Sequence, residues 1–581
     1  MRKTRSVRHG YRVSPIRGAR FRRVTAGLTA WCFFMHVTLL PVVAQRVVVD
    51  PDAAASHQAT LDTAPNGVPI QNIAAPNASG LSHNKFQEFN VGTEGLVINN
   101  RQAHGQSTLA GYILGNPNLQ GGSEARLILN EVTGSTRSSL EGHTEIFGHP
   151  AEYILANPYG ITCNGCGFLN IPRATFTTGA PTLDAATGLL TGFSVNGGDV
   201  MIGEHGVNGL ELDYFDIVSR AIHVNGVIHG QDVGLFAGRN DFDYAARTVT
   251  ARAADGSSKP RFGIDSSLLG GMYANRITLV GTEAGVGVRA PARMSAGTAG
   301  MVLTANGNLM VRHATSEGRI TAHAQRNSLA IDGNVRADTA LELMARDEIR
   351  LSQTAAAVAG GDLTASSKRL ILGRDAILAA GLDHDGNLLA SGTVNVTATD
   401  ELTSSREALL VGGHRIKVTA GAVSNSGTIS AGGQTTVTAA TSVTNRGAIT
   451  AQDDLAVTAG ATLTNEAAAT ISSGHTLTLA VHDLVNRGTL AAQTGLDTTT
   501  TGAMENAGTV HSGKAATFTI AETFHNRNGA TVLTKENLTL SASTIENAGE
   551  MIVEGNAAVT ARTGAVSNSG KLSAGGRTTV T

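Results

Sequence analysis

Two cysteines stand three positions apart in the motif Cys163-Asn-Gly-Cys166, and this spacing is compatible with three kinds of chemistry. Such a pair can be a redox-active dithiol, half of a zinc site or a small structural disulfide. The redox motif requires a helix start, which the surrounding proline and glycines disfavour. Zinc would need two further ligands, and no paired Cys or His supplies them. We favour a disulfide formed after export, while a free dithiol stays open.

Two aspartates and two histidines are the other side chains whose spacing could serve catalysis. Asp241 and Asp243 are two residues apart, so a strand would present both carboxylates on one face, as a polysaccharide-cutting groove requires. His223 and His229 are an even number apart in one alternating run, which predicts that both face solvent on one side. No serine-nucleophile elbow and no paired metal spacing accompany them. We predict no catalytic residue, no metal and no cofactor.

Two further segments resemble ligand loops and lack a required residue. The segment 508–515 is one residue short of a phosphate-binding loop, because Ala515 stands where a Ser or Thr would hold magnesium. The segment 383–387 begins like a calcium loop, but Val394 stands where the bidentate Glu is needed. We interpret the first as part of a repeat and the second as a turn.

The composition favours short strands and excludes most helical enzymes. Of 581 residues, 69 are Gly, while aromatic residues make up only 4 % and charged residues 15 %. The 41 % of hydrophobic residues suffices for a buried core, which argues against a disordered chain. The first 44 residues hold nine of the 44 Lys and Arg and none of the 46 acids. The remaining chain is acidic, so nucleic acid is not an expected partner.

The basic N-terminus leads into an apolar run from Ala26 to Leu40 and then a small-residue cleavage pattern ending at Ala44. This order is typical of a secretory signal peptide, here an extended one over residues 1–44. The apolar run is too short for a membrane span and is interrupted by His36. We therefore expect an exported chain that retains only Cys163 and Cys166.

A repeat of 20 or 21 residues dominates residues 401–581. Its marker is an asparagine two positions after an apolar residue, found at Asn425, Asn445, Asn465, Asn486, Asn506, Asn526, Asn547 and Asn568. A fixed period of this length indicates a solenoid, and alternation such as Thr428-Ile429-Ser430-Ala431 predicts short strands with Ile429 inward. We predict an all-β fold, a right-handed parallel β-helix, in which the asparagines stack and hydrogen-bond as a ladder.

The rest of the chain is less periodic. Residues 291–400 alternate in pieces, which predicts a continuing but irregular β-helix. The repeat is much weaker over residues 45–290, where we expect a separate N-terminal domain with short extra-helical β elements. The sequence stops at Thr581 inside a unit, without a capping segment, so we expect a fragment truncated from a longer protein.

Several N-terminal motifs resemble those of one export family. They are the segment from Gly67 to Asn100, the Cys163–Phe168 segment and two Asn-Pro motifs, Asn116-Pro117-Asn118-Leu119 and Asn157-Pro158-Tyr159-Gly160-Ile161. Together these resemble the two-partner secretion (haemagglutination activity) domain of filamentous haemagglutinin-like exoproteins, and the later repeats resemble the haemagglutinin repeats of that family. Each Asn-Pro pair also fits a strand-ending turn. Both a turn and a secretion signal therefore remain open.

The resemblance implies an export route and a place. The partner it implies is an outer-membrane transporter barrel with periplasmic polypeptide-transport domains, which would pass the chain unfolded to the surface or medium of a Gram-negative bacterium. The implied function is an adhesin for a host or neighbouring-cell surface receptor. The alternative within the family is the N-terminal part of a contact-dependent growth-inhibition toxin-delivery protein, and the alternative of another class is a β-helical polysaccharide-degrading enzyme.

Overall fold

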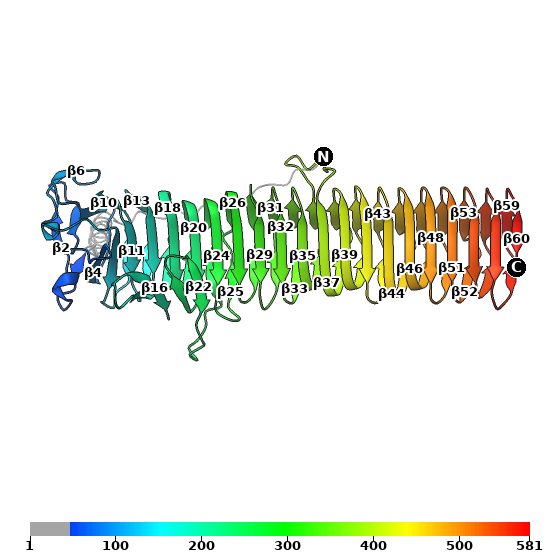
Figure 1. The fold of residues 1–581 in the computed structure, drawn as a ribbon, viewed down its shortest axis with the longest axis horizontal. Helices are drawn as coiled ribbons and strands as arrows, with labels where there is room; N and C mark the ends of the chain where they lie inside the picture. Colours follow the sequence, from blue (N-terminus) through cyan, green and yellow to red (C-terminus); the bar gives the residue numbers. More distant parts are fainter. Residues whose placement is uncertain (1–46) are drawn as a thin grey trace, which may run out of the picture. The chain divides into compact units, whose positions relative to one another are not determined.

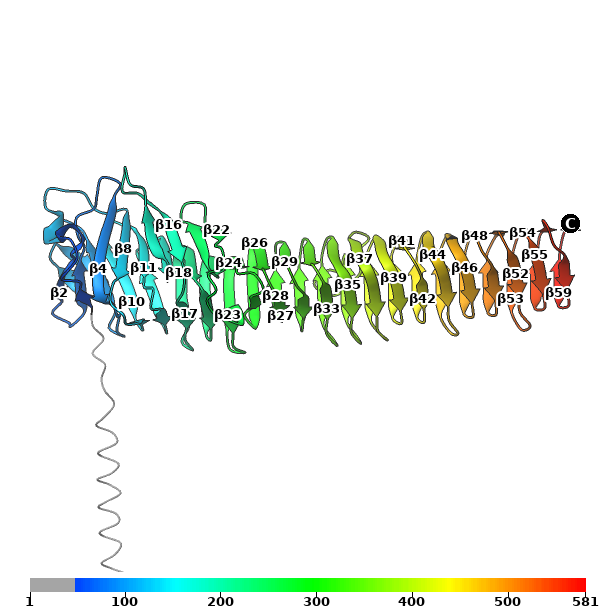
Figure 2. The ribbon, with the colours of Figure 1, turned by 90° about the horizontal axis from the view of Figure 1, so that it is seen from below.

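The computed structural model describes residues 47–581, so the predicted signal peptide 1–44 lies outside the described residues. These residues form a rod of stacked coils, in which strands lie across the long axis and pair with the coils before and after them (Figures 1 and 2). Each coil contributes strands to three parallel faces, which we call faces 1, 2 and 3. In residues 47–581 no helix is long and apolar enough to span a membrane.

Face 1 contains strands that follow the corner after face 3. They are β3 (Pro69–Asn72), β5 (Leu96–Asn100), β10 (His143–Gly148), β13 (Cys166–Leu169), β28 (His313–Ser316), β31 (Asn334–Ala337), β34 (Ala356–Ala359), β36 (Ile377–Ala380), β38 (Leu409–Gly412), β40 (Thr428–Ala431), β43 (Ala448–Ala451), β45 (Thr470–Ser473), β47 (Thr489–Ala492), β50 (Thr509–Ser512), β53 (Thr531–Thr534), β56 (Glu550–Val553) and β59 (Lys571–Ala574).

Face 2 contains the strands that come next along the chain. They are β4 (Leu81–Glu88), β8 (Leu127–Val132), β11 (Glu152–Ala156), β14 (Arg173–Thr177), β29 (Ile320–Ala324), β32 (Leu341–Ala345), β41 (Gln434–Ala439), β48 (Gly495–Thr500), β51 (Ala515–Ile520), β54 (Leu538–Ala542), β57 (Ala557–Ala561) and β60 (Thr578–Val580).

Face 3 completes each coil. Its strands are β9 (Ser138–Leu140), β12 (Ile161–Cys163), β17 (Asp199–Ile202), β19 (Ala221–Val224), β23 (Phe262–Ser266), β25 (Gly287–Arg289), β27 (Leu309–Val311), β30 (Leu329–Ile331), β33 (Glu348–Leu351), β42 (Val443–Asn445), β49 (Met504–Asn506), β52 (Thr523–Asn526), β55 (Thr544–Asn547) and β58 (Val566–Asn568).

Some strands are long enough to run around a corner and serve two faces. Those on faces 1 and 2 are β18 (Val207–Ser219), β20 (Val227–Ala237), β24 (Gly271–Gly281) and β26 (Arg293–Ala305). Those on faces 2 and 3 are β35 (Leu363–Leu372), β37 (Thr393–Ser404), β39 (Arg415–Asn425), β44 (Leu455–Asn465) and β46 (Thr476–Asn486).

Further elements lie outside this parallel ladder, all in the N-terminal part. They are β1 (Val48–Val49), the 3-10 helix η1 (Ala55–His57), β2 (Thr60–Thr63), the hairpin β6 (Gly105–Ser107) and β7 (Gly111–Ile113), the 3-10 helix η2 (Pro117–Leu119), and the antiparallel sheet of β15 (Ala180–Leu183), β16 (Leu190–Val195), β21 (Asn240–Asp243) and β22 (Thr248–Ala251). We call this four-stranded sheet the extra sheet. The prediction of an all-β parallel solenoid with extra β elements near its N-terminus is confirmed.

The core follows the alternation that the sequence predicts. Ile429 and Val437 are fully buried, whereas their outward neighbours are partly exposed. Equivalent inward residues stack from coil to coil, as Ile429 does on Ile449 and Ile471. The interior is therefore one continuous apolar column, and each coil depends chiefly on its two neighbours for burial.

Residues 291–400 are more regular than we predicted. Ala314, Val335, Ala357 and Leu378 stack in register on face 1, as in the later repeats. In the following coil Leu378 stacks on Leu410, 32 positions later. The spacing is longer here because residues 381–392 form an inserted loop that extends from the coil into solvent. The periodicity is blurred in the sequence because these coils lack the asparagine marker and carry this insertion, not because the backbone is irregular.

The repeat asparagines form the predicted ladder at the end of face 3. From Asn425 to Asn547, each Nδ2 donates to Oδ1 of the next asparagine over 2.6–2.9 Å, and Asn568 ends the row. The same Nδ2 groups also donate to a backbone carbonyl of the following coil, for example Asn486 to Thr509. Ser404 occupies the preceding position and hydrogen-bonds to Asn425. The ladder satisfies a row of buried amides that apolar neighbours would leave unpaired.

Candidate functional site

The first Asn-Pro motif forms η2, with Asn116 as the residue that caps it. Asn116 Oδ1 accepts from the N–H of Asn118 at 2.8 Å, and Asn116 Nδ2 donates to the carbonyls of Ile73 and Asn99, each at 2.9 Å. Asn116 is 1 % exposed, and Leu119 is fully buried. The motif therefore fastens a turn between chain segments that are far apart in the sequence.

The second Asn-Pro motif forms the corner after β11. Asn157 Nδ2 donates to the Thr136 carbonyl at 2.9 Å and to Ser138 Oγ at 3.0 Å, while its Oδ1 accepts from the N–H of Tyr159 at 2.9 Å. Gly160 has a φ of +106°, and a Cβ there would lie 2.9 Å from the backbone carbonyl oxygen of Asp199. Glycine is therefore required at this position, and Ile161 then enters the core.

Both asparagine side chains are buried and fully occupied by the fold. Of the nine motif residues, solvent reaches mainly Pro117, Pro158 and Tyr159, the last of which is 54 % exposed. The hydrogen bonds of Asn116 and Asn157 go to different segments, so the two motifs serve different coils. The asparagines thus act on the shape of the corners, and any direct contact with an export partner falls to the exposed residues of these motifs.

We predict that Asn157→Ala destabilises the coils around its corner by about 1–3 kcal/mol, because the Thr136 carbonyl and the Tyr159 N–H lose their partners in a buried site. Hydrogen exchange of the exported chain over residues 136–177 measures this loss. Pro158→Ala is the matched control, since Pro158 is exposed and donates no hydrogen bond. Equal exchange in the two variants would contradict the structural role.

Cys163 and Cys166 are joined in a disulfide at the corner between β12 and β13. Both are buried, and the bridge encloses only Asn164 and Gly165, whose φ of +93° suits glycine. The surroundings are strands and a turn, not the strand-to-helix junction of a redox motif. Asn164 Oδ1 accepts from the N–H of His205 at 2.9 Å, which ties this corner to the next coil. The arrangement therefore fits a structural bridge.

Because the closed loop is so short, we expect the double variant Cys163→Ser/Cys166→Ser to lose only about 1–2 kcal/mol. Denaturant unfolding followed by a probe local to residues 140–210 measures this loss. A loss well above that range would show that the bridge supports more than its own corner.

Asp241 and Asp243, the pair whose spacing could have served catalysis, lie on β21 of the extra sheet. Asp241 Oδ1 accepts from Arg252 Nη1 at 2.7 Å and from Ser194 Oγ at 2.8 Å. Desolvation raises the pKa of Asp241, but the hydrogen bonds from Arg252 and Ser194 outweigh it and leave the pKa below its ordinary value. Asp243 instead accepts from the N–H of Ala246 in the following turn. Asp241 is thus an ion-paired carboxylate, unlike the protonated acid that glycoside hydrolysis requires.

The prediction for the two histidines is wrong in one respect. His223 lies on β19 of face 3 and His229 on β20, because the chain turns at Asn225 and Gly226 between them. Both point outward, but from different faces of the coil. The His229 ring stacks on Tyr273 of the next coil, with ring centroids 5.4 Å apart. An even spacing places two residues on the same side only within one unbroken strand, and here a corner separates the two histidines.

The two partial ligand motifs are ordinary coil segments. Residues 508–515 run through β50 into the start of β51, with a turn at Gly513 and Lys514. Asp383 Oδ1 accepts from the N–H groups of Asp385 and Asn387 at 3.0 and 2.7 Å, which closes the turn of the inserted loop. Within residues 47–581, no three Cys, His, Asp or Glu side chains gather as a metal site.

A buried ion cluster under the extra sheet was not predicted. Asp216 is fully buried and accepts from Arg247 Nη2 at 2.8 Å and from Arg173 Nη2 at 3.1 Å. Burial raises the pKa of the Asp216 carboxyl, although hydrogen bonds and charge from Arg247 and Arg173 work against that rise. The Arg173 guanidinium also lies 3.7 Å from the ring centroid of Tyr244. The cluster joins β14 and β18 to the turn between β21 and β22, residues that only the coil register brings together.

Two family models match consecutive parts of the chain. Residues 46–311 match the TPS secretion domain, and residues 317–405, 411–481, 472–528 and 526–581 match the haemagglutinin repeat. A solved structure, the filamentous hemagglutinin secretion domain, is 34 % identical, covers 52 % of this chain and 97 % of its own, and has a TM-score of 0.43.

Two curated relatives are far longer than this chain. The "16S rRNA endonuclease CdiA" of Enterobacter cloacae is 39 % identical over 68 % of this chain and 12 % of its own length. The "Toxin CdiA" of Escherichia coli is 37 % identical over 67 % of this chain and also 12 % of its own length. The chain thus spans about an eighth of these relatives. With the secretion domain followed by its repeats over nearly all the described residues, the chain belongs to the two-partner secretion exoprotein family.

Proposed function

We propose that this chain is the export domain and the first part of the shaft of a contact-dependent toxin-delivery protein. The observation that carries this proposal is the match to proteins named as CdiA toxins and nucleases across both the secretion domain and the first repeats. The family resemblance alone implies an adhesin, whereas these relatives favour the delivery alternative. The toxic activity would then reside in a more distal part of a longer protein.

The proposed route is transfer through an outer-membrane barrel with polypeptide-transport domains, followed by folding at the surface or in the medium. Two features support passage of an unfolded chain. The Cys163–Cys166 bridge closes a loop of two residues, which adds little width to a threading chain. Each coil pairs with its immediate neighbours, so coils can form one after another as they emerge.

We propose that residues 45–581 carry no enzymatic activity of their own. The support is the ion pair of Asp241 with Arg252, which keeps that carboxyl charged, and the separate engagement of Asp243. Breakdown of a polysaccharide by the purified chain, lost in an Asp241→Ala/Asp243→Ala variant, would overturn this proposal.

A co-culture competition tests the delivery function. A strain with the intact gene is mixed with a target strain that lacks the gene and its neighbours, and both are counted. We expect target counts to fall at least tenfold, and to recover when codons 45–581 are deleted in frame. If target counts stay level while attachment between cells drops on deletion, adhesion is the function and the delivery proposal fails.

A further inference from the structure

A groove opens on the corner between faces 1 and 2, where two bulges form its walls. In β18, the four residues Leu210–Asp213 stand opposite the single Gln231 of β20. In β26, Gly297–Ala299 stand opposite the single Asn275 of β24. The two strands between them, β20 and β24, stay in register and form the floor. Three strand spacings separate the walls, roughly 14 Å.

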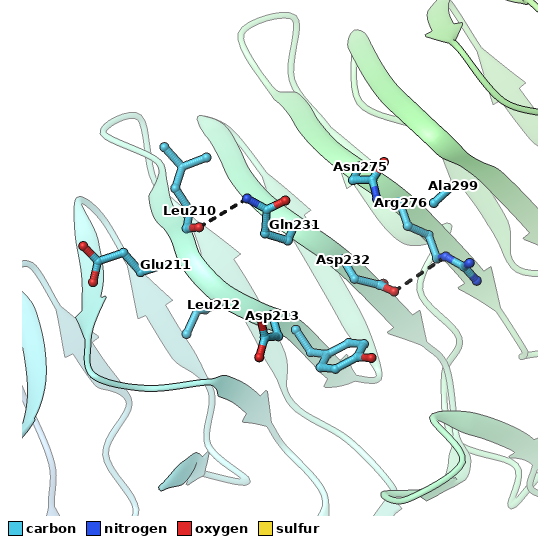
Figure 3. Close-up of a pocket in the computed structure, with 10 residues that line it drawn as sticks. Leu210, Glu211, Leu212, Asp213, Gln231, Asp232, Asn275, Arg276 and Ala299 are labelled. Atoms are coloured by element: carbon cyan, nitrogen blue, oxygen red, sulfur yellow. Dashed lines mark hydrogen bonds and ion pairs between the residues drawn. The ribbon is translucent and has the colours of Figure 1, made fainter. Parts of the chain in front are cut away.

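The floor presents four polar side chains side by side. Gln231 and Asp232 come from β20, and Asn275 and Arg276 from β24 (Figure 3). The groove encloses about 570 Å³, within the range of about 300–1,000 Å³ typical of small-ligand sites. Unlike most such sites it is lined mainly by polar groups, with Leu210 and the ring of Tyr214 at one side. Its ligand should therefore offer many hydrogen-bonding groups.

The buried ion cluster holds one end of the floor in place. Asp232 accepts from Arg247 Nη2 at 3.0 Å and lies 3.6 Å from Arg276 Nε, while Arg247 is itself anchored on the buried Asp216. The Arg247 guanidinium also lies 4.5 Å from the ring centroid of Tyr214. Because these ion pairs already hold Asp232 and Arg276 in place, the two side chains lose little conformational freedom when a ligand binds.

The side-chain amides of Gln231 and Asn275 make few hydrogen bonds within the protein. Gln231 Nε2 makes one long contact, 3.5 Å to the Leu210 carbonyl, and neither Gln231 nor Asn275 is buried. Each amide offers two donors and one acceptor oxygen, which matches the paired donor and acceptor character of adjacent hydroxyls. A half-exposed tyrosine ring, 41 % exposed at Tyr214, adds a flat surface for C–H groups.

The charge of the lining selects against acidic ligands. Glu211, Asp213 and Asp232 outnumber the single cation Arg276 among the lining residues. Phosphates, uronic acids and other anions would meet net repulsion here. We propose that this groove binds a short neutral oligosaccharide, with Gln231, Asn275, Asp232 and Arg276 as its hydrogen-bonding groups. This site goes beyond the proposed delivery function and does not depend on it.

The test uses the full exported chain and an array of neutral and acidic oligosaccharides, followed by calorimetry with the neutral oligosaccharide that gives the strongest signal. We expect binding to neutral members, and at least a tenfold rise in Kd for the Gln231→Ala/Asn275→Ala variant. Both side chains reach solvent, so the fold should persist, and unchanged hydrogen exchange of β20 and β24 verifies it. Asn395→Ala is the matched control, an outward amide on face 2 of a later coil, away from the groove.

Each outcome decides the proposal. Absence of binding to every neutral oligosaccharide, preference for acidic members, or an equal Kd in the Gln231→Ala/Asn275→Ala variant would overturn it. If the chain binds whole bacteria and the same free oligosaccharide displaces it, the natural ligand is a cell-surface glycan. If the chain binds only the free sugar, the natural ligand is a soluble oligosaccharide. Failure of the co-culture competition would leave these results untouched.

Discussion

Asp216→Ala is expected to destabilise the coils beneath the extra sheet by about 3–5 kcal/mol, because it leaves two guanidinium groups without their shared carboxylate. Arg173 and Arg247 both donate to Asp216, and the side chain of Asp216 is fully buried. Arg247 stands in the turn between β21 and β22, so its release should loosen the extra sheet. Hydrogen exchange over residues 180–195 and 240–251 measures this effect, while coils beyond residue 420 should be unchanged.

Asp216→Asn tests whether the charge of the buried carboxylate is what stabilises the sheet. An amide has one acceptor oxygen and turns its NH2 group toward guanidinium hydrogens, so we expect it to keep little of the lost stability. Asp241→Asn is the control, because it breaks the exposed ion pair with Arg252 in the same sheet and should cost at most about 1 kcal/mol. A well-tolerated Asp216→Asn would mean that the buried carboxyl is neutral and that the ion cluster is not what holds the sheet.

Asn486→Ala should open the ladder and destabilise its neighbouring coils by about 2–4 kcal/mol. Asn486 donates to Asn506 Oδ1 and to the Thr509 carbonyl, and it accepts from Asn465 Nδ2. All three bonds are lost at a position where the Asn486 side chain is fully buried. Hydrogen exchange in β44 and β49 is the measurement, because a long solenoid opens by coils and has no single unfolding midpoint.

Two further variants separate the ladder from simple packing. Val485→Ala shortens the adjacent outward side chain and should change exchange little, since Val485 is partly exposed. Asn486→Ser should recover part of the stability, because Ser404 already occupies an equivalent position and bonds to Asn425. Equal exchange in Asn486→Ala and Val485→Ala would mean that the ladder does not stabilise these coils.

The repeats were predictable because one local pattern determines their structure. Alternation sets which residues face inward, and the fixed period sets which residues stack, so Ile429 and the Asn425 ladder follow from spacing alone. The N-terminal part obeys the same physics with less regular corners. Its family was apparent from the Asn-Pro motifs, although the sequence does not reveal that Asn116 and Asn157 are buried in their turns.

The ion cluster and the groove could not be predicted, because both depend on register. Arg173, Asp216 and Arg247 are distant in sequence, and no local pattern pairs them. The groove exists because β18 and β26 each insert residues that their neighbours lack, and an inserted residue within a strand resembles an ordinary turn in the sequence. The histidine prediction was wrong for the related reason that an unseen corner between His223 and His229 resets the alternation.

Export of the chain with and without its outer-membrane partner tests the central claim most directly. The full chain is produced in a heterologous Gram-negative host, alone or with an outer-membrane transporter barrel taken from the same genome, and the amount of chain outside the cell is measured by immunoblot. Release that requires both the barrel and residues 46–311 is the predicted result. Equal release without the barrel, or from a chain lacking residues 46–311, would contradict the assignment of this region as the secretion domain.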